Sequence, residues 1–437
     1  MNMIRLVESF NLFLAVLFTV AYFYQLVYLA IGLVKRRRWK QAEAAQYHRY
    51  AAVISARNEA GVIGELIQSL KQQNYPAHLL DIYVVADNCT DDTAQVSRRA
   101  GAIVYERFNQ SKKGKGYALN FLFRTLAREG RDQYDAYFIF DADNLVDPNF
   151  VLEMNKVYDQ GGYGAITCYR NSRNFGANWI SAGYAIWFLR EARFLNFPRM
   201  LLGTNCHVSG TGFLISADVI RENKGWPYHL LTEDIEFSAN SILEGTRISY
   251  TPTAVLYDEQ PITFRDSWNQ RFRWAKGFYQ VFWHYGARLA KGIAVNPKGA
   301  RFACYDMLMT IAPGMLLSII SILFNTIIIV LAATGVMSTG VAIASSVTSV
   351  VFCLCNYIVF MFVFGVLTTF VEWDSIRTTT AKKIRYMFTF PFFMLTYIPI
   401  ALVALVKKCK WKPIQHSISV DVAEFSDAAN SKRERTM

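Results

Sequence analysis

The sequence has few charged residues and lacks the cysteine and glycine patterns of several common site types. Charged side chains make up 18% of the 437 residues, whereas 53% are hydrophobic, which is more apolar than an ordinary soluble chain. The seven cysteines are scattered without zinc-type pairs, and their number is odd. A zinc site or a disulfide framework is therefore not expected, and reduced thiols fit a cytosolic domain. No G-x-x-x-x-G-K-[ST] stretch is present, which excludes a Walker loop.

The hydrophobic residues are concentrated in two parts of the chain, at 10–34 and 302–406, while 40–300 is typical of a globular domain. The net charge of +12 could indicate nucleic acid binding, but the basic clusters lie beside the apolar runs. They occur at 35–38, 382–385 and 407–412. Basic residues there mark cytoplasmic loops and contact anionic lipids. We expect membrane lipids as partners, and no nucleic acid.

The apolar runs predict a multi-pass protein of the plasma membrane with its globular domain in the cytoplasm. Residues 1–39 should hold an N-terminal transmembrane helix, since Phe10 to Val34 carries no acid or base and is long enough to span. The region 301–372 should form a transmembrane hairpin from Tyr305–Ala333 and Val341–Val371. Basic residues follow the first helix, so the N-terminus should lie outside.

Two further regions are expected at the membrane interface. Residues 261–300 should form amphipathic helices that mix aromatic and basic side chains, although burial in the globular core explains that pattern equally well. Residues 373–416 contain an apolar stretch with Pro391 and Pro399 and basic clusters on both sides. An interfacial or re-entrant segment, with a possible gating loop, keeps both clusters inside. The polar tail 417–437 should be disordered.

The region 40–260 predicts an α/β domain of the Rossmann type. Apolar runs at Ala51–Ser55, Ile82–Ala86, Ala102–Tyr105 and Ala136–Phe140 alternate with helical patterns. This alternation indicates βαβ units and a mostly parallel sheet covered by helices. Ligands of such sheets bind beyond the carboxyl ends of the strands, so the residues that follow each strand are the candidates for a site.

Carboxylates follow three of these strands. Glu59 comes after the first strand, Asp87 follows the second, and Asp141 and Asp143 follow the fourth. Hard oxygen ligands suit Mg²⁺ or Mn²⁺, which bind through one or two carboxylates and substrate phosphates. A solvated turn is the alternative interpretation of the Asp-Ala-Asp triplet. Lys115 lies in a Gly- and Lys-rich loop before a helix, which suits phosphate binding or is simply a flexible basic loop.

Two later motifs could carry the reaction. Thr232-Glu233-Asp234 precedes a helical pattern and could supply a general base, or simply a Thr cap with acids in the first helical turn. Gln270, Arg273 and Trp274 share one face of the next helix. They offer an amide, a guanidinium for a leaving diphosphate and an indole for a sugar ring. Alternatively, the Trp and Arg simply lie at the level of the lipid head groups on an interfacial helix.

The ordered series of motifs resembles the family 2 glycosyltransferases. It reads ARNE, DNCTDD, KGKG-x-ALN, DAD, TED and QRFRW between Tyr50 and Gly277. The resemblance is to the processive branch that contains cellulose, chitin, hyaluronan and poly-N-acetylglucosamine synthases. It implies a GT-A fold and a metal-dependent, inverting hexosyl transfer from a UDP-sugar, such as UDP-glucose or UDP-N-acetylglucosamine, into a β-linked polysaccharide that is exported.

The same resemblance implies roles for individual residues. The nucleotide sugar would contact Ala56, Asn58, Glu59, Asp87, Lys115, Asp141 and Trp411. Asp141 and Asp143 would hold the metal, and Asp234 would act as the base beside Glu233. Gln270, Arg273 and Trp274 would line the diphosphate, and Trp274, Gly210, Thr211 and Gly212 would border the acceptor.

Some features depart from the processive branch. The gating sequence F-x-V-T-x-K is absent, and only about three full spans are expected, from span length. An enzyme that adds one sugar to a lipid carrier such as polyprenyl phosphate is therefore the alternative. Homo-oligomers or an accessory export subunit are possible partners. A transporter or a non-catalytic polysaccharide-binding protein is disfavoured, because the spans have almost no charge and DAD and TED are intact.

Overall fold

The computed structural model describes residues 3–34, 40–296, 299–311, 313–335 and 339–409. Its globular part is built on one eight-stranded sheet in the order β3-β2-β1-β4-β7-β6-β8-β5. The strands are β1 Tyr50–Ala56, β2 Leu80–Asp87, β3 Ile103–Arg107, β4 Ala136–Asp141, β5 Leu145–Val146, β6 Ala165–Ser172, β7 Phe213–Ser216 and β8 Ile248–Asp258. Strands β1, β2 and β4 contain the runs that the sequence predicts, β3 begins one residue after the predicted start at Ala102, and the α/β fold class is confirmed.

The strands pair in two different ways across the sheet. β1 pairs in parallel with β2 and β4, and β2 pairs in parallel with β3. Beyond β4 the sheet is mixed, because β7 runs antiparallel to both β4 and β6. The expectation of a mostly parallel sheet therefore holds only for the first half. The apolar β1, β2 and β4 are largely buried on both faces, as strands covered by helices must be, whereas the edge strand β3 is only partly buried.

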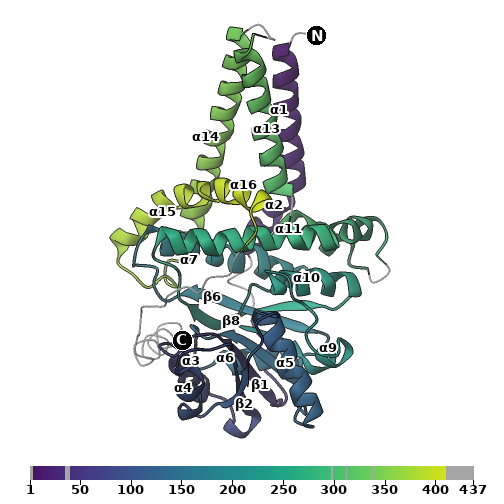
Figure 1. Ribbon diagram of the computed structural model, residues 1–437, viewed down its shortest axis with the longest axis vertical. Coiled ribbons are helices and arrows are strands. Elements are labelled where there is room, and N and C mark those ends of the chain that lie inside the picture. Colours follow the sequence, from purple (N-terminus) through teal and green to yellow (C-terminus); the bar gives the residue numbers. More distant parts are fainter. Residues whose placement is uncertain (1–2, 35–39, 297–298, 312, 336–338, 410–437) are drawn as a thin grey trace.

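Helices cover both faces of this sheet, and most are short. They are α3 Ile63–Lys71, η2 Ala77–Leu79, α4 Thr93–Arg99, α5 Lys115–Arg128, α6 Phe150–Asp159, α7 Trp179–Glu191, η3 Ala192–Asn196, α8 Phe197–Leu201, α9 Ala217–Glu222 and α10 Glu233–Glu244. η3 is a π-helical turn that continues α7. The 31-residue helix α11, Phe264–Ala294, lies along the side of the domain that faces the apolar helices (Figure 1).

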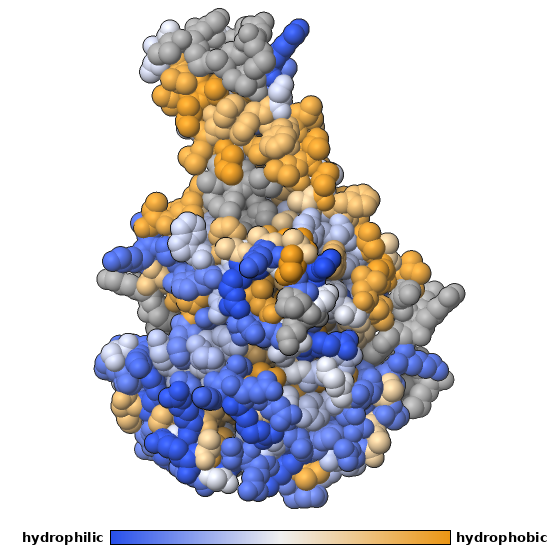
Figure 2. Space-filling model, turned by 90° about the vertical axis from the view of Figure 1, so that its right-hand side faces the viewer, coloured by the Kyte–Doolittle hydropathy of each residue, from blue (hydrophilic) through white to orange (hydrophobic). Residues whose placement is uncertain are grey.

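A separate group of apolar helices rises from that side of the domain (Figure 1). It consists of α1 Met3–Tyr22, α13 Pro313–Ala333 and α14 Thr339–Val371. Figure 2 shows the hydrophobic surface of this group above a mostly hydrophilic domain. Among the described residues, Ser346–Val371 and Thr380–Val406 are long and apolar enough to cross a membrane, and the bent pair Val7–Tyr22 and Tyr24–Val34 makes a third candidate.

One of the expected spans is bent. The chain bends by 40° between α1 and α2 Tyr24–Val34, and α2 packs against η3 and α8 of the globular domain. The region of the expected helix Tyr305–Ala333 contains α12 Arg301–Ile311 and α13, which begins at Pro313. Residue 312, between these two helices, lies outside the described residues.

The last two helices lie at the base of the apolar group, with α16 along α11 and α15 against α14 and α7 (Figure 1). These are α15 Thr380–Leu395 and α16 Tyr397–Val406. Tyr279 of α11 donates to the carbonyl of Ala401 at 3.2 Å, and Lys276 Nζ donates to that of Ala404 at 2.9 Å. This position agrees with an interfacial segment, although its length and composition would also allow a span. The tail 417–437 lies outside the described residues.

Candidate active site

One cavity of about 2300 Å³ begins at the carboxyl ends of β1, β2 and β4 and continues to the apolar helices. Most of the predicted site residues line it. They are Glu59, Asp87, Lys115, Asp141, Asp143, Gly210, Glu233, Asp234, Gln270, Arg273 and Trp274. Its far end is lined by residues of α1, α13, α14, α15 and α16. The motifs that are far apart in the sequence thus meet around one space, which reaches the helices expected in the membrane.

Lys115, at the start of α5, is paired with the first aspartate after β4. Its Nζ lies 2.6 Å from Asp141 Oδ1 and donates to the carbonyl of Gly210 at 2.7 Å. Burial alone would lower the pKa of Lys115, but the negative charges of Asp141, Glu233 and Asp234 outweigh it and raise that pKa above its usual value. The lysine is therefore held as a cation among carboxylates, where it can meet a phosphate.

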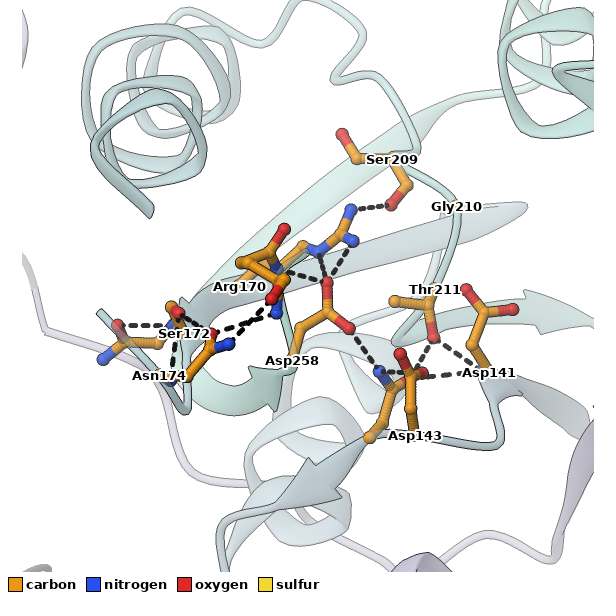
Figure 3. Close-up of polar contacts among 12 residues, drawn as sticks. Asp141, Asp143, Arg170, Ser172, Asn174, Ser209, Gly210, Thr211 and Asp258 are labelled. Carbon is orange, nitrogen blue, oxygen red and sulfur yellow. Dashed lines mark hydrogen bonds and ion pairs between the residues drawn. The ribbon is translucent and has the colours of Figure 1, made fainter. Parts of the chain in front are cut away.

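A hydrogen-bond network fixes the loop that carries Asp141 and Asp143 (Figure 3). The N–H of Asp141 donates to Thr211 Oγ1 at 2.9 Å, and the hydroxyl of Thr211 bonds to Asn144. Asn144 in turn donates to Asp258 Oδ1 at 3.0 Å. The carboxylates of the motif therefore project from a loop whose backbone has little freedom to move.

Arg170 of β6 pairs with Asp258 at the end of β8 and completes this network. Its Nε lies 2.9 Å from Asp258 Oδ2, and its Nη1 donates to the carbonyl of Ser209 at 3.0 Å. The pair joins two neighbouring strands to the segment that contains Gly210, as Figure 3 shows. Arg170 thus positions the loop on which the predicted acceptor residues lie.

Glu233 and Asp234 form the first turn of α10 and face the same cavity. Burial raises the pKa of both carboxyls, and their mutual repulsion adds to this for Glu233, while Lys115 opposes it. A carboxylate that is less stable as an anion is a stronger base, which is the property that a general base needs. The hydroxyl of Thr232 makes no capping hydrogen bond, so simple helix capping does not explain this motif.

A close approach of two helices brings α10 to the motif on α11. A methyl group at Gly277 would lie 2.5 Å from Thr232 Cγ2, so only glycine allows this contact. Gln270, Arg273 and Trp274 line the cavity on the same helix. Gln270 Oε1 is buried without a hydrogen-bond partner, and no ion pair of Arg273 occurs among the described residues. Both groups have free capacity to bind a ligand.

Aromatic contacts set the orientation of Trp274. The rings of Tyr184 and Phe188, both on α7, meet it edge-on with centroid distances of 5.6 and 6.1 Å. The side chain is half-buried, so part of the indole remains accessible. This arrangement leaves a rigid aromatic surface at the cavity wall.

Asp87 lies at the end of β2 between two arginines. Arg57 Nη2 lies 2.7 Å from Asp87 Oδ2, and Arg107 bonds to Oδ1. The carboxylate is 3% exposed and also accepts from Asn88. The two arginines neutralise it, so its acceptor capacity is already largely used.

Four of the predicted site residues that the structure describes do not line the cavity. Asn58 is exposed and holds Thr90, whose N–H donates to Asn58 Oδ1 at 2.8 Å. Ala56, Thr211 and Gly212 are buried behind the lining residues. Trp411 lies outside the described residues. The roles expected for Ala56 and Asn58 in nucleotide binding therefore lack a direct contact with this space, whereas Thr211 acts through Asp141.

Sequence reasoning missed several charged residues of the site. Arg57, Arg170 and Asp258 line the cavity, but only Arg57 lies within a recognised motif. The position of Asp258 at the end of a long strand could have identified it, because the acids of the other motifs occupy equivalent places. Arg170 had no such signal, since its partner is 88 residues away.

The two aspartates after β4 fit a divalent cation. They offer hard oxygen ligands beside a lysine, and in the described part of the chain no group of three His, Cys, Asp or Glu could hold a metal alone. Mg²⁺ and Mn²⁺ are commonly bound by one or two carboxylates together with substrate phosphates, so this donor set is sufficient once a diphosphate is present.

Comparison with known proteins agrees with this geometry. The chain is 24% identical over 249 residues to a beta-monoglucosyldiacylglycerol synthase of Synechocystis sp., a match that covers 56% of this chain and 50% of the relative. It is 26% identical over 235 residues to a poly-beta-1,6-N-acetyl-D-glucosamine synthase of Staphylococcus aureus, covering 52% and 54%. The chain thus spans about half the length of the curated relatives it matches.

A solved structure shows the same fold. The mannosyltransferase PcManGT from Pyrobaculum calidifontis, in complex with GDP-Man and Mn²⁺, has a TM-score of 0.55 and 18% sequence identity, over 92% of this chain and 99% of that one. The model of the protein family described as "Glycosyltransferase like family 2" matches residues 48–277, which is just over half of the chain. From this match, the chain belongs to glycosyltransferase family 2.

Proposed function

We propose that this protein is an inverting hexosyltransferase of the plasma membrane that takes its donor from the cytoplasm and its acceptor from the membrane. The donor is a UDP-sugar, UDP-glucose or UDP-N-acetylglucosamine, as the resemblance of the motifs implies. The observation that carries the proposal is the single cavity that begins at Asp141 and Asp234 and ends among α1, α13 and α14. A lipid acceptor could enter along these helices without leaving an apolar environment.

The charges around the cavity define a site for the donor diphosphate. Lys115 and Arg273 provide cationic groups, and Gln270 provides an unpaired amide oxygen for a donor hydroxyl. Asp141 and Asp143 would hold Mg²⁺ or Mn²⁺, which would neutralise charge on the departing diphosphate. Preorganised positive groups at the place where negative charge develops stabilise the transition state.

Asp234 is assigned as the general base. Its pKa is raised by burial, so it accepts the proton of an acceptor hydroxyl more readily than an exposed aspartate would. As that proton moves to Asp234, the oxygen attacks the anomeric carbon of the sugar and the bond to UDP breaks. A single displacement turns an α-linked donor into a β-linked product.

Polymer synthesis is the second candidate. The sequence Q-x-x-R-W on α11 and the match to the poly-N-acetylglucosamine synthase favour it. It would require a path for the chain across the membrane and possible export partners. The lipid-facing end of the cavity favours a lipid acceptor as the main proposal.

UDP release by the detergent-purified protein tests the chemistry. Each UDP-sugar and GDP-mannose would be supplied with Mn²⁺ or Mg²⁺ in the presence of extracted membrane lipids. We expect turnover with one UDP-sugar, loss of about 10²-fold or more in Asp234→Asn, and loss on addition of EDTA. Asp218→Asn is the matched control, because Asp218 is exposed on α9 and far from the motifs. Turnover that is unchanged in Asp234→Asn would refute the assignment of the base.

A further inference from the structure

Two buried arginines line the cavity where the globular domain meets the apolar helices. Arg190 of α7 is 8% exposed and Arg271 of α11 is 1% exposed. Neither belongs to the chemistry assigned above. Arg190 lies against Phe364 of α14, Arg271 lies against Phe393 of α15, and these two helices pack on each other at the cavity.

Arg271 is only partly satisfied by the protein. Its Nη1 donates to the carbonyl of Phe393 at 3.0 Å and to Thr396 Oγ1 at 2.8 Å. Its Nη2 is buried and has no hydrogen-bond partner among the described residues. The guanidinium lies over the ring of Phe393 at 4.3 Å. The Nη2 group of this rigid, charged guanidinium is therefore left without an acceptor.

Arg190 has a similarly incomplete environment. Its Nη2 donates to Gln25 Oε1 at 3.0 Å, and its guanidinium lies 5.0 Å from the ring centres of both Trp187 and Phe364. Burial lowers the pKa of Arg190 to about 10, despite the negative charge of the neighbouring Glu191. The charged form of this side chain thus lacks the stabilisation that a directly bound anion would give.

A third buried arginine shows what a compensated site looks like in this protein. Arg199, 1% exposed, makes two hydrogen bonds of 2.7 and 2.8 Å to the carboxylate of Asp306. No ion pair of Arg190 or Arg271 occurs in the ranges that the structure describes. A buried charge without an opposite charge is unfavourable, and a bound anionic ligand would offset this cost.

The surroundings indicate which anion would fit. Tyr357, Met361 and Phe364 of α14 line the cavity beside these arginines, as does Met394 of α15. Such walls suit an acyl or prenyl chain, while an arginine fork matches the oxygens of a phosphate. Basic pockets between membrane helices on the cytoplasmic side bind phosphate head groups.

We infer that the cavity binds the phosphate of a membrane lipid between Arg190 and Arg271. This inference rests on the proposed function and identifies its acceptor as a lipid that carries both a phosphate and a hydroxyl. The phosphate anchors the head group, and the hydroxyl beyond it is the group that Asp234 deprotonates. Arg190 and Arg271 are therefore positioning residues for the acceptor.

Three probes separate the contributions of the phosphate and the chains. Phosphatidylglycerol carries a phosphate, two acyl chains and a free hydroxyl. Diacylglycerol lacks the phosphate, and glycerol 1-phosphate lacks the acyl chains. Binding to the full-length protein in detergent would be measured by microscale thermophoresis for the wild type, Arg190→Gln and Arg271→Gln. Arg265→Gln is the matched control, because Arg265 is an exposed arginine in the first turn of the same helix as Arg271.

We expect phosphatidylglycerol to bind at least about tenfold more tightly than diacylglycerol, and each cavity variant to lose about tenfold, as for one charged hydrogen bond. Arg265→Gln should change binding less than about twofold. Equal binding of diacylglycerol, or unchanged binding in both variants, would overturn the inference. Glycerol 1-phosphate that binds as tightly as phosphatidylglycerol would also overturn it, in favour of a site for a soluble phosphate.

UDP release in the same samples separates this inference from the proposed function. If UDP is still released while phosphatidylglycerol and diacylglycerol bind equally well, the inference fails and the glycosyltransferase assignment stands. Arg271→Gln could unfold the protein, because Arg271 links α11 to the end of α15 through Phe393. In that case the test relies on Arg190→Gln, whose described side-chain hydrogen bond goes to Gln25 of α2.

Discussion

Replacement of Asp306 by asparagine should destabilise the junction between the apolar helices and the globular domain. Asp306 of α12 is fully buried and accepts from Arg199 of α8 at 2.7 and 2.8 Å. It also accepts from the hydroxyls of Tyr24 and Tyr28 of α2, at 3.0 and 2.9 Å. One carboxylate therefore holds together three helices that are distant in the sequence.

The size of the effect follows from the burial of both partners. Removing one member of a buried ion pair leaves the other charged and unpaired, which typically costs about 3–5 kcal/mol. Asp306→Asn should lose most of this stability, because Arg199 is 1% exposed. Replacing both partners with apolar residues, as in Arg199→Met with Asp306→Leu, should recover at least about half of the loss.

Thermal unfolding in detergent, followed by intrinsic fluorescence, would measure these changes. The control is Glu244→Gln, which breaks the exposed Arg288–Glu244 pair of 2.9 Å and should cost less than about 1 kcal/mol. The unfolding temperature of Asp306→Asn should fall by several degrees. A shift no larger than that of the control would refute the reasoning, as would a double variant less stable than Asp306→Asn.

Two further variants test packing and protonation. A methyl group at Gly116 would lie 2.0 Å from the carbonyl oxygen of Tyr228, so Gly116→Ala should lose about 1–3 kcal/mol, measured by thermal unfolding. Gly64→Ala, whose methyl would only touch Val96 at 3.7 Å, should not be destabilised, and equal losses would contradict the packing argument. Burial lowers the pKa of His207 to about 3, so the free energy of unfolding should fall by about 1.4 kcal/mol per pH unit below about pH 6.5. His207→Gln should reduce the loss of unfolding temperature between about pH 7.5 and 5.5, unlike the exposed control His78→Gln.

The first half of the sheet and the acids at its edge could be predicted from the sequence because both depend on local patterns. Buried parallel strands are continuous apolar runs, and the residue that follows each one lies at the same edge. That rule predicts Asp87 and Asp141 at one edge of the sheet, and both line the cavity in the structure. The i, i+3 and i+4 spacing likewise placed Gln270, Arg273 and Trp274 on one helix face.

The remaining features depend on contacts between distant residues, which no local pattern encodes. The antiparallel β7 is four residues long and too short for a periodic signal. The pairing of Arg170 with Asp258 follows from the way separate elements pack, as does the lack of an acidic partner for Arg271 among the described residues. The bend between α1 and α2 also reflects tertiary structure, because α2 packs closely against η3. A methyl group at Gly32 of α2 would lie 2.8 Å from Phe194 Cδ1 of η3.

The fate of the transferred sugar tests the central claim most directly. Purified protein would be incubated with its UDP-sugar, radiolabelled in the sugar, together with membrane lipids, and the products would be divided between an organic phase and an aqueous phase. The account predicts label in the organic phase, released by β-glycosidase and absent in Asp234→Asn. Label in an aqueous, high-mass product would contradict a lipid acceptor and identify the protein as a polysaccharide synthase.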